Sequence, residues 1–162
     1  MSREAPSSTI PTRNTERVGG RVGALPAAAG ALLALAVAWI HVTDQGGFPG
    51  DKSPGYIAVG YYVLELVAVV LAVGLLTPAT RHRIGTWLVA AAVGAGPMIG
   101  YALTRGPGLP GAMDDRGNWG EPLGVASLVV EGLLILLSLA CAGQLRSSTR
   151  TGSPSLNSTS QR

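Results

Sequence analysis

Four long apolar stretches dominate this sequence of 162 residues and limit what it can fold into. None of them carries more than one Asp, Glu, Lys or Arg, and they cover about residues 22–42, 56–77, 84–104 and 123–143. A helix needs about 20 apolar residues to cross a hydrocarbon layer about 30 Å thick. Each stretch therefore predicts one membrane crossing.

The composition favours the same fold class. Charged residues make up 13% of the chain, where roughly 25% is typical of soluble domains. A soluble bundle would also need a polar stripe along each helix. We therefore expect an all-α protein, an antiparallel four-helix transmembrane bundle in a lipid bilayer, rather than a water-soluble enzyme. A signal peptide is the alternative for the first stretch, but its 19 apolar residues exceed the 7 to 15 or so usual for a signal sequence.

The two ends of the chain differ from the spans. Residues 1–21 and 144–162 are rich in Ser, Thr and Arg and poor in large apolar residues. Such segments bury too little surface to offset the entropy of ordering them. We expect both to be disordered tails on the cytoplasmic side.

Basic residues predict the orientation of the spans. With both tails on one side, that side holds nine Arg residues, and the other side holds Lys52, Arg105 and Arg116. Cytoplasmic segments carry the excess of Lys and Arg, so both termini are expected in the cytoplasm. The basic residues are scattered, which argues against nucleic-acid binding. Eleven Arg against one Lys, with abundant Ala and Gly, favours a GC-rich bacterial genome and hence the plasma membrane of a bacterium.

Glu65 and Glu131 are the most informative residues, because an ionisable group within a span normally faces the bundle interior or a water-filled cavity. Both are expected about 12 to 14 Å below the same membrane boundary. If they meet, the pair would share a proton or bind a cation. The alternative is that each carboxyl is a structural hydrogen-bonding group. Local partners exist at one helical turn: Ser127 for Glu131, and Tyr61 and Tyr62 for Glu65.

His41 ends the first span, and Asp44 follows on the same helical face. An imidazole oriented by a carboxylate is typical of metal ligands and proton shuttles. No second His lies nearby in the sequence, so no metal site is predicted and a hydrogen-bonded interfacial His41 is favoured. Haem or quinone binding near His41 is a further alternative, although no second ligand or CxxCH motif supports it.

Small residues and a long loop flank Tyr101. Ala92, Gly96 and Gly100 recur every four residues in the third span, with Pro97 among them. This spacing favours close helix packing and a kink; the alternative is a cavity beside Tyr101. The loop over residues 105–122 is rich in Gly and Pro, which is typical of lids and binding loops as well as of mobile connectors. Its candidate residues are Arg105, Trp119 and Glu121.

No common catalytic fingerprint is present in the sequence, and the single Cys141 cannot form an intrachain disulfide. The segments GYIAVGYYVLELVAVVLAVGLL, GYALTRGPGLPG and NWGEPLGVASLVVEGLLIL resemble a family of small four-span bacterial membrane proteins. The resemblance covers most of residues 30–140 and implies the same four-helix architecture, but no particular reaction or cofactor. It draws attention to His41, Glu65, Arg105, Trp119, Glu121, Pro122 and Glu131.

Three functions follow as hypotheses. The leading one is a non-enzymatic accessory or assembly protein with a polar pocket open to the outside, lined by His41, Tyr62, Glu65, Tyr101 and Glu131. Its external loop would contact a membrane-protein partner or a second copy of the chain. The second is a small proton- or cation-coupled carrier that uses Glu65 and Glu131. The third is a redox subunit that holds haem or quinone near His41.

Overall fold

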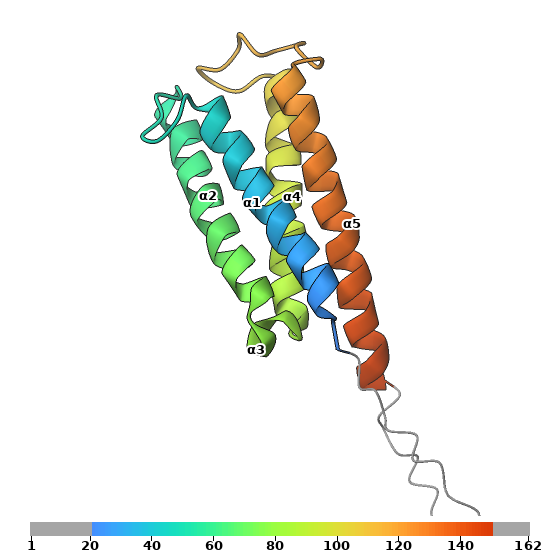
Figure 1. The fold of residues 1–162 in the computed structure, drawn as a ribbon. Coiled ribbons are helices and arrows are strands. Elements are labelled where there is room, and N and C mark those ends of the chain that lie inside the picture. The colour runs from blue at the N-terminus through green and yellow to red at the C-terminus, as the bar shows by residue number, and fades with distance from the viewer. Residues whose placement is uncertain (1–20, 151–162) are drawn as a thin grey trace, which may run out of the picture.

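The computed structural model describes residues 21–150, and this part of the chain is all-helical (Figure 1). Its helices are α1 (Ala24–Asp44), α2 (Gly55–Leu76), α3 (Pro78–Arg81), α4 (Ile84–Arg105) and α5 (Pro122–Arg150). Within the described residues, α1, α2, α4 and α5 are long and apolar enough to cross a membrane. The prediction of an all-α bundle with four membrane-spanning helices is therefore confirmed.

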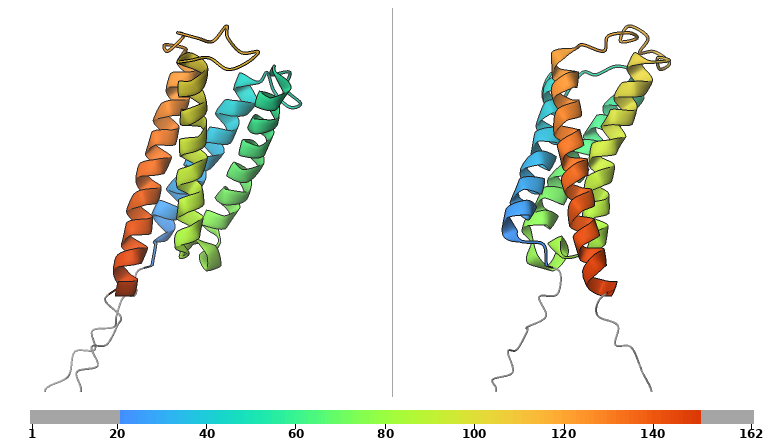
Figure 2. Two further views of the ribbon diagram at one scale, coloured as in Figure 1. Left: turned by 180° about the vertical axis from the view of Figure 1, so that it is seen from behind. Right: turned by 90° about the vertical axis from the view of Figure 1, so that its right-hand side faces the viewer.

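The four long helices form an antiparallel bundle. α1 packs along α2 and α5, and α4 packs along α5 and, less closely, along α2, so that α2 and α5 occupy opposite corners. Residues 45–54 and 106–121 form loops at one end, and α3 and both ends of the described chain lie at the other (Figures 1 and 2). We call these the loop end and the α3 end.

The helix bounds match the predicted spans to within two residues, except in α5. This helix continues to Arg150, so residues 144–150, expected to be disordered, are helical. Leu145 is buried, and the hydroxyls of Ser147 and Ser148 donate to the carbonyls one turn earlier. Because Leu145 is buried and the helical backbone hydrogen bonds continue, the helix extends past the apolar stretch. The other residues predicted to be disordered, 1–20 and 151–162, lie outside the described residues.

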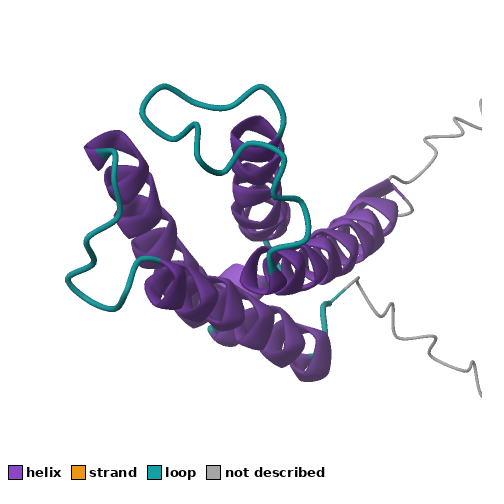
Figure 3. Ribbon diagram, turned by 90° about the horizontal axis from the view of Figure 1, so that it is seen from above, coloured by secondary structure: helices purple, strands orange, loops and turns teal. Residues whose placement is uncertain are grey.

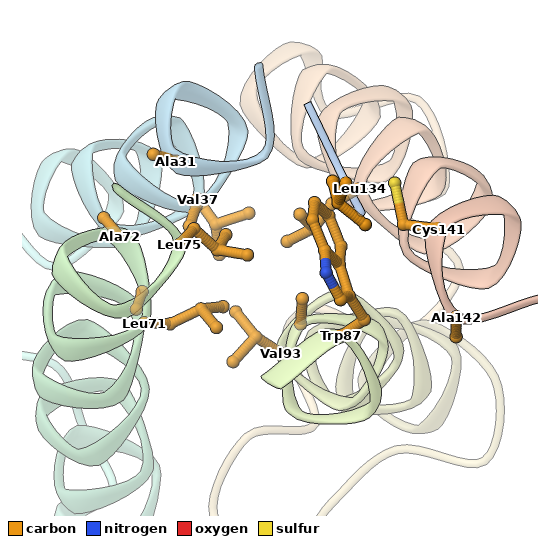
Figure 4. Close-up of a cluster of buried hydrophobic side chains, with 14 of the residues drawn as sticks. Ala31, Val37, Leu71, Ala72, Leu75, Trp87, Val93, Leu134, Cys141 and Ala142 are labelled. Atoms are coloured by element: carbon orange, nitrogen blue, oxygen red, sulfur yellow. The ribbon is translucent and has the colours of Figure 1, made fainter. Parts of the chain in front are cut away.

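The core fills the half of the bundle next to α3. Figure 4 shows Leu71 and Leu75 from α2, Trp87 from α4 and Leu134 from α5 pointing toward one another. The indole of Trp87 is fully buried, and its Nε1 donates to the carbonyl of Arg81 at 2.8 Å. Small residues such as Ala34 let α1 approach this cluster. Close packing seals the α3 end of the bundle.

One glycine sets the distance between α4 and α5. A Cβ added at Gly94 would lie 2.7 Å from the backbone oxygen of Glu131 and 2.8 Å from a side-chain carbon of Ile135. The expectation that Gly96 and Gly100 make the close contact was wrong, because a Cβ at either position would meet no atom within 4 Å. Their face of α4 points away from α5, since a helix turns about 100° per residue. α4 continues through Pro97 as one helix.

The first prediction concerns Gly94. Replacing it with Ala forces α4 and α5 apart beside Glu131, and overpacking of this kind costs about 1 to 3 kcal/mol. We expect Gly94→Ala to lower the free energy of unfolding in a detergent titration followed by circular dichroism. Gly132→Ala on α5 is the matched control, because a Cβ there meets nothing within 4 Å. Equal stability of the two variants would contradict the assigned packing.

Candidate functional site

A cavity of about 520 Å³ occupies the loop half of the bundle. All four long helices line it, and it lies where α2 and α4 diverge; Figure 3 shows the bundle from the loop end. Its deeper walls are apolar and include Val63 and Val67 of α2 and Val89 and Val93 of α4. Gly60 on α2 and Gly100 on α4 leave the space between these walls open, because a Cβ at either would meet nothing within 4 Å.

His41 and Glu131 bring a polar pair to the cavity wall. His41 Nε2 of α1 lies 4.0 Å from Glu131 Oε1 of α5, and Glu131 is only 1% exposed. His41 Nδ1 donates to the carbonyl of Val37 at 2.9 Å. Because a carbonyl only accepts, Nδ1 carries the hydrogen, and Nε2 is the nitrogen left to face Glu131. The pair therefore lies between α1 and α5, and both of its residues line the cavity.

Glu131 has hydrogen-bonding capacity that the bundle leaves unused. The Ser127 hydroxyl, one turn earlier on α5, donates to Glu131 Oε1 at 2.5 Å, and the contact predicted between these residues is confirmed. Glu131 Oε2 is buried and has no hydrogen-bond partner among the described residues. A buried oxygen without a partner is uncommon and costly in a folded protein.

Glu65 lies outside this cavity. Its Oε1 accepts a hydrogen bond of 2.9 Å from Gln45 Nε2, just past the end of α1, and both residues are buried. No hydrogen bond or ion pair links Glu65 to Glu131 within residues 21–150, so the expected meeting of the two carboxyls does not occur. Their helices occupy opposite corners of the bundle. The partner of Glu65 is Gln45, directly after α1, whereas the hydrogen-bond partner of Glu131 is Ser127 on its own helix.

Asp44 organises the polar residues near the loop between α1 and α2. Its Oδ2 accepts hydrogen bonds from Lys52 Nζ at 2.5 Å and from the Tyr61 hydroxyl at 2.6 Å. We call Asp44, Lys52 and Tyr61 the Asp44 cluster; all three line the cavity. The Tyr61 ring stands edge-on to His41, with ring centroids 4.9 Å apart. Asp44 thus bonds to Lys52 and Tyr61 rather than to His41, whose hydrogen bond goes to the carbonyl of Val37.

Tyr62 also departs from its predicted place. Its hydroxyl accepts from the backbone N–H of Gly50 at 3.0 Å and donates to the carbonyl of the same residue at 3.2 Å. It does not line the cavity. Of the five predicted pocket residues, the structure thus brings His41, Tyr101 and Glu131 to one cavity, and it places Tyr62 and Glu65 beside the first loop.

The second loop is attached to the end of α4. Arg105 forms a 2.9 Å ion pair with Asp115 and donates to the carbonyl of Asn118. The Tyr101 hydroxyl donates to the carbonyl of Trp119 at 2.6 Å, and the two rings are in edge contact. We call Tyr101, Arg105, Asp115 and Trp119 the Arg105 cluster. It holds residues 106–121 at the cavity mouth and leaves Trp119 52% exposed.

Glu121, which also lines the cavity, precedes α5 and caps its first turn with its carboxylate. Its two oxygens accept the backbone N–H groups of Leu123 and Gly124, and Pro122 is the first helical residue. A carboxylate at this position satisfies unpaired N–H groups, and proline suits the first turn. A Cβ at Gly124 would lie 2.5 Å from the Tyr101 ring. The segment EPLG therefore has a structural role, which is to start the helix against Tyr101.

Sequence reasoning missed Gln45 and the contribution of Lys52. Gln45 lies three residues beyond the predicted end of the first span, so nothing marked it as a partner for a carboxyl inside the membrane. The sequence pattern marks Lys52 only as a basic residue that bears on the orientation of the spans. Among residues 21–150, no group of three or more His, Cys, Asp or Glu side chains is arranged to hold a metal ion.

Comparison with protein-family models, with curated proteins and with solved structures finds no match to this chain. The resemblance to small four-span bacterial membrane proteins therefore stays a prediction.

The second prediction concerns the bond between Gln45 and Glu65. Glu65→Gln keeps an acceptor for Gln45 Nε2, and we expect stability close to that of the native protein. Glu65→Leu leaves the buried amide without its partner, which costs about 1 to 3 kcal/mol. The same detergent titration measures both. The double variant Gln45→Leu/Glu65→Leu should recover part of the loss, and equal stabilities for all three variants would show that the bond contributes nothing.

Proposed function

We propose that this chain is a membrane protein that binds a small amphipathic molecule in the cavity between α2 and α4. The observation that carries the proposal is that Glu131, whose buried Oε2 has no hydrogen-bond partner among the described residues, lines a cavity of about 520 Å³. Binding sites for small molecules are typically 300 to 1,000 Å³, mostly apolar, with few placed polar groups. This cavity has that size and that character.

The arrangement of the walls defines how such a molecule would lie. Glu131 is nine residues into α5, about 14 Å from its start, and Val89 is 16 residues before the end of α4, about 24 Å from it. The apolar walls thus extend deeper than the carboxyl. The polar group of the ligand would meet Glu131 and His41, and its apolar part would lie along Val67 and Val89.

The third prediction tests this function by filling the cavity. Gly100→Leu places a side chain in the open space, and we expect it to abolish binding of tritiated phenyloctanol and phenyloctylamine to the protein in lipid nanodiscs. Gly132→Leu adds the same side chain on α5, at a position where a Cβ also meets nothing within 4 Å and which does not line this cavity. This control should bind as the native chain does.

Scintillation proximity, with empty nanodiscs as the blank, measures the binding. Saturable binding of at least one probe to the native chain, lost only in Gly100→Leu, supports the proposal. Absence of saturable binding of both probes to the native chain, or equal binding to the two leucine variants, would overturn it.

We further propose that the protein spans the plasma membrane of a bacterium with both termini in the cytoplasm. Arg21, Arg81, Arg83 and Arg146 belong to the α3 end, and Lys52, Arg105 and Arg116 belong to the loop end. With the Arg residues of both tails, the full sequence has nine basic residues on the first side and three on the other. This bias supports a cytoplasmic α3 end.

The fourth prediction tests the orientation. Cys141 is the only cysteine, so Cys141→Ala gives a background free of thiols. On that background we expect a membrane-impermeant maleimide to label Asp114→Cys in intact cells and Ala79→Cys only after permeabilisation. Both positions are exposed in the structure. The reverse pattern would place the termini outside.

The accessory role is a second candidate, and the surface of the loops favours it. Phe48 of the first loop is 78% exposed, and Met113 and Trp119 of the second loop are 50% and 52% exposed. Apolar side chains on external loops are suited to contact a membrane-protein partner or a second copy of the chain. Native mass spectrometry of the protein extracted from membranes tests both, and a purely monomeric species would count against this candidate.

The geometry gives less support to the other two hypotheses. A carrier that uses Glu65 and Glu131 as one titrating pair needs the two carboxyls in one site, but only Glu131 lines the cavity. Haem ligation by His41 would use Nε2, which faces the carboxyl of Glu131. The visible spectrum of the purified protein tests haem directly.

A further inference from the structure

The charges that line the cavity do not balance. Four acidic residues line it, Asp44, Asp115, Glu121 and Glu131, against two basic residues, Lys52 and Arg105. A ligand that enters this space therefore meets an excess of two acidic groups, or of one if His41 carries a positive charge.

All but one of these acidic groups already have a partner of opposite charge or a set of N–H donors. Asp44 pairs with Lys52 at 2.5 Å, and Asp115 pairs with Arg105 at 2.9 Å. The two oxygens of Glu121 accept backbone N–H groups of α5. The remaining carboxyl belongs to Glu131, whose Oε2 has no partner among the described residues.

We propose that the ligand is a lipophilic organic cation that carries N–H donors, such as an alkylammonium, and that its positive group binds Glu131 Oε2. This proposal rests on the proposed function, because it names the class of molecule that the same cavity takes. An N–H donor satisfies the unpaired oxygen, and a positive charge makes the bond a charge-assisted one, which is stronger than a neutral bond. A cation also offsets the acidic excess of the lining.

The aromatic residues of the lining fit the same ligand class. Tyr61 and Tyr101 both line the cavity, from α2 and α4 respectively. Each ring already lies near a cation of the protein: Lys52 Nζ is 5.4 Å from the centroid of Tyr61, and the Arg105 guanidinium is 5.0 Å from that of Tyr101. Ring faces attract ammonium groups within about 6 Å. Because both rings already have a cation of the protein beside them, the rings and the valines form the wall for the apolar part of the ligand, and its positive group is left to Glu131.

His41 provides the competing explanation. Its Nε2 lies 4.0 Å from Glu131 Oε1, beyond hydrogen-bond distance but within range of an ion pair. If the imidazole is positively charged, it is the counter-charge of Glu131, and the site then has no preference for a cation. In that case a neutral donor of the same shape would bind as tightly as an amine.

The fifth prediction uses the two probes introduced above, because phenyloctylamine and phenyloctanol differ only in their terminal group. We expect the native chain in nanodiscs to bind the amine about tenfold or more tightly than the alcohol, after subtraction of binding to empty nanodiscs. Glu131→Gln should reduce this ratio to about one. Glu65→Gln removes the other carboxyl of the spans, which lies outside the cavity, and should leave the ratio unchanged.

A measurement on the native chain guards against misfolding of Glu131→Gln. Dicyclohexylcarbodiimide modifies carboxyls in apolar surroundings, and mass spectrometry locates the adduct. We expect the amine, but not the alcohol, to protect Glu131 from this reagent. Protection by both probes, or a binding ratio of one in the native chain, would overturn the cation proposal while leaving the proposed function intact. Loss of saturable binding of both probes would instead overturn the proposed function.

Discussion

In a lipid environment every polar group needs a partner within the protein, and this requirement governs the bundle more than any single apolar contact. Helices satisfy their own backbone groups, but the side chains of Glu65 and Glu131 need partners from elsewhere. Glu65 accepts a hydrogen bond from Gln45, directly after α1, and Glu131 accepts one from Ser127 of its own helix and faces His41 of α1 at 4.0 Å. The last turn of α1 thus fixes α2 on one side and α5 on the other. The position of α4 follows from its contact with α5.

The interiors of the two halves of the bundle are packed differently. Next to α3, large side chains such as Trp87 and Leu134 fill the space between all four helices. Toward the loops, α2 and α4 diverge and the interior is left as a cavity. Between these halves, Gly94 lets α4 approach the backbone of α5 at Glu131. Glu131 is thereby held where α4 and α5 pack closely, and it also lines the cavity.

Much of the fold was predictable from the sequence, but the pairing of polar residues was not. The spans follow from apolar length alone, and the bond from Ser127 to Glu131 follows from a spacing of one helical turn. Depth in the membrane also follows from counting residues, which is why Glu65 and Glu131 were expected to meet. Which helices are neighbours does not follow from counting. The partner of Glu65 comes from Gln45, beyond the predicted span, and α2 is diagonal to α5.

The glycines of α4 show why a motif of small residues is ambiguous. Gly94 and Gly96 are two residues apart and therefore lie on nearly opposite faces of the helix. On one face a Cβ would strike the backbone of α5, and on the other it would meet nothing within 4 Å. The same residue type thus brings two helices together on one side and keeps a cavity open on the other. Gly60 continues the open surface on α2. The space between α2 and α4 therefore exists because both walls lack side chains at these positions. A molecule that fills it would make packing contacts that the chain itself does not make.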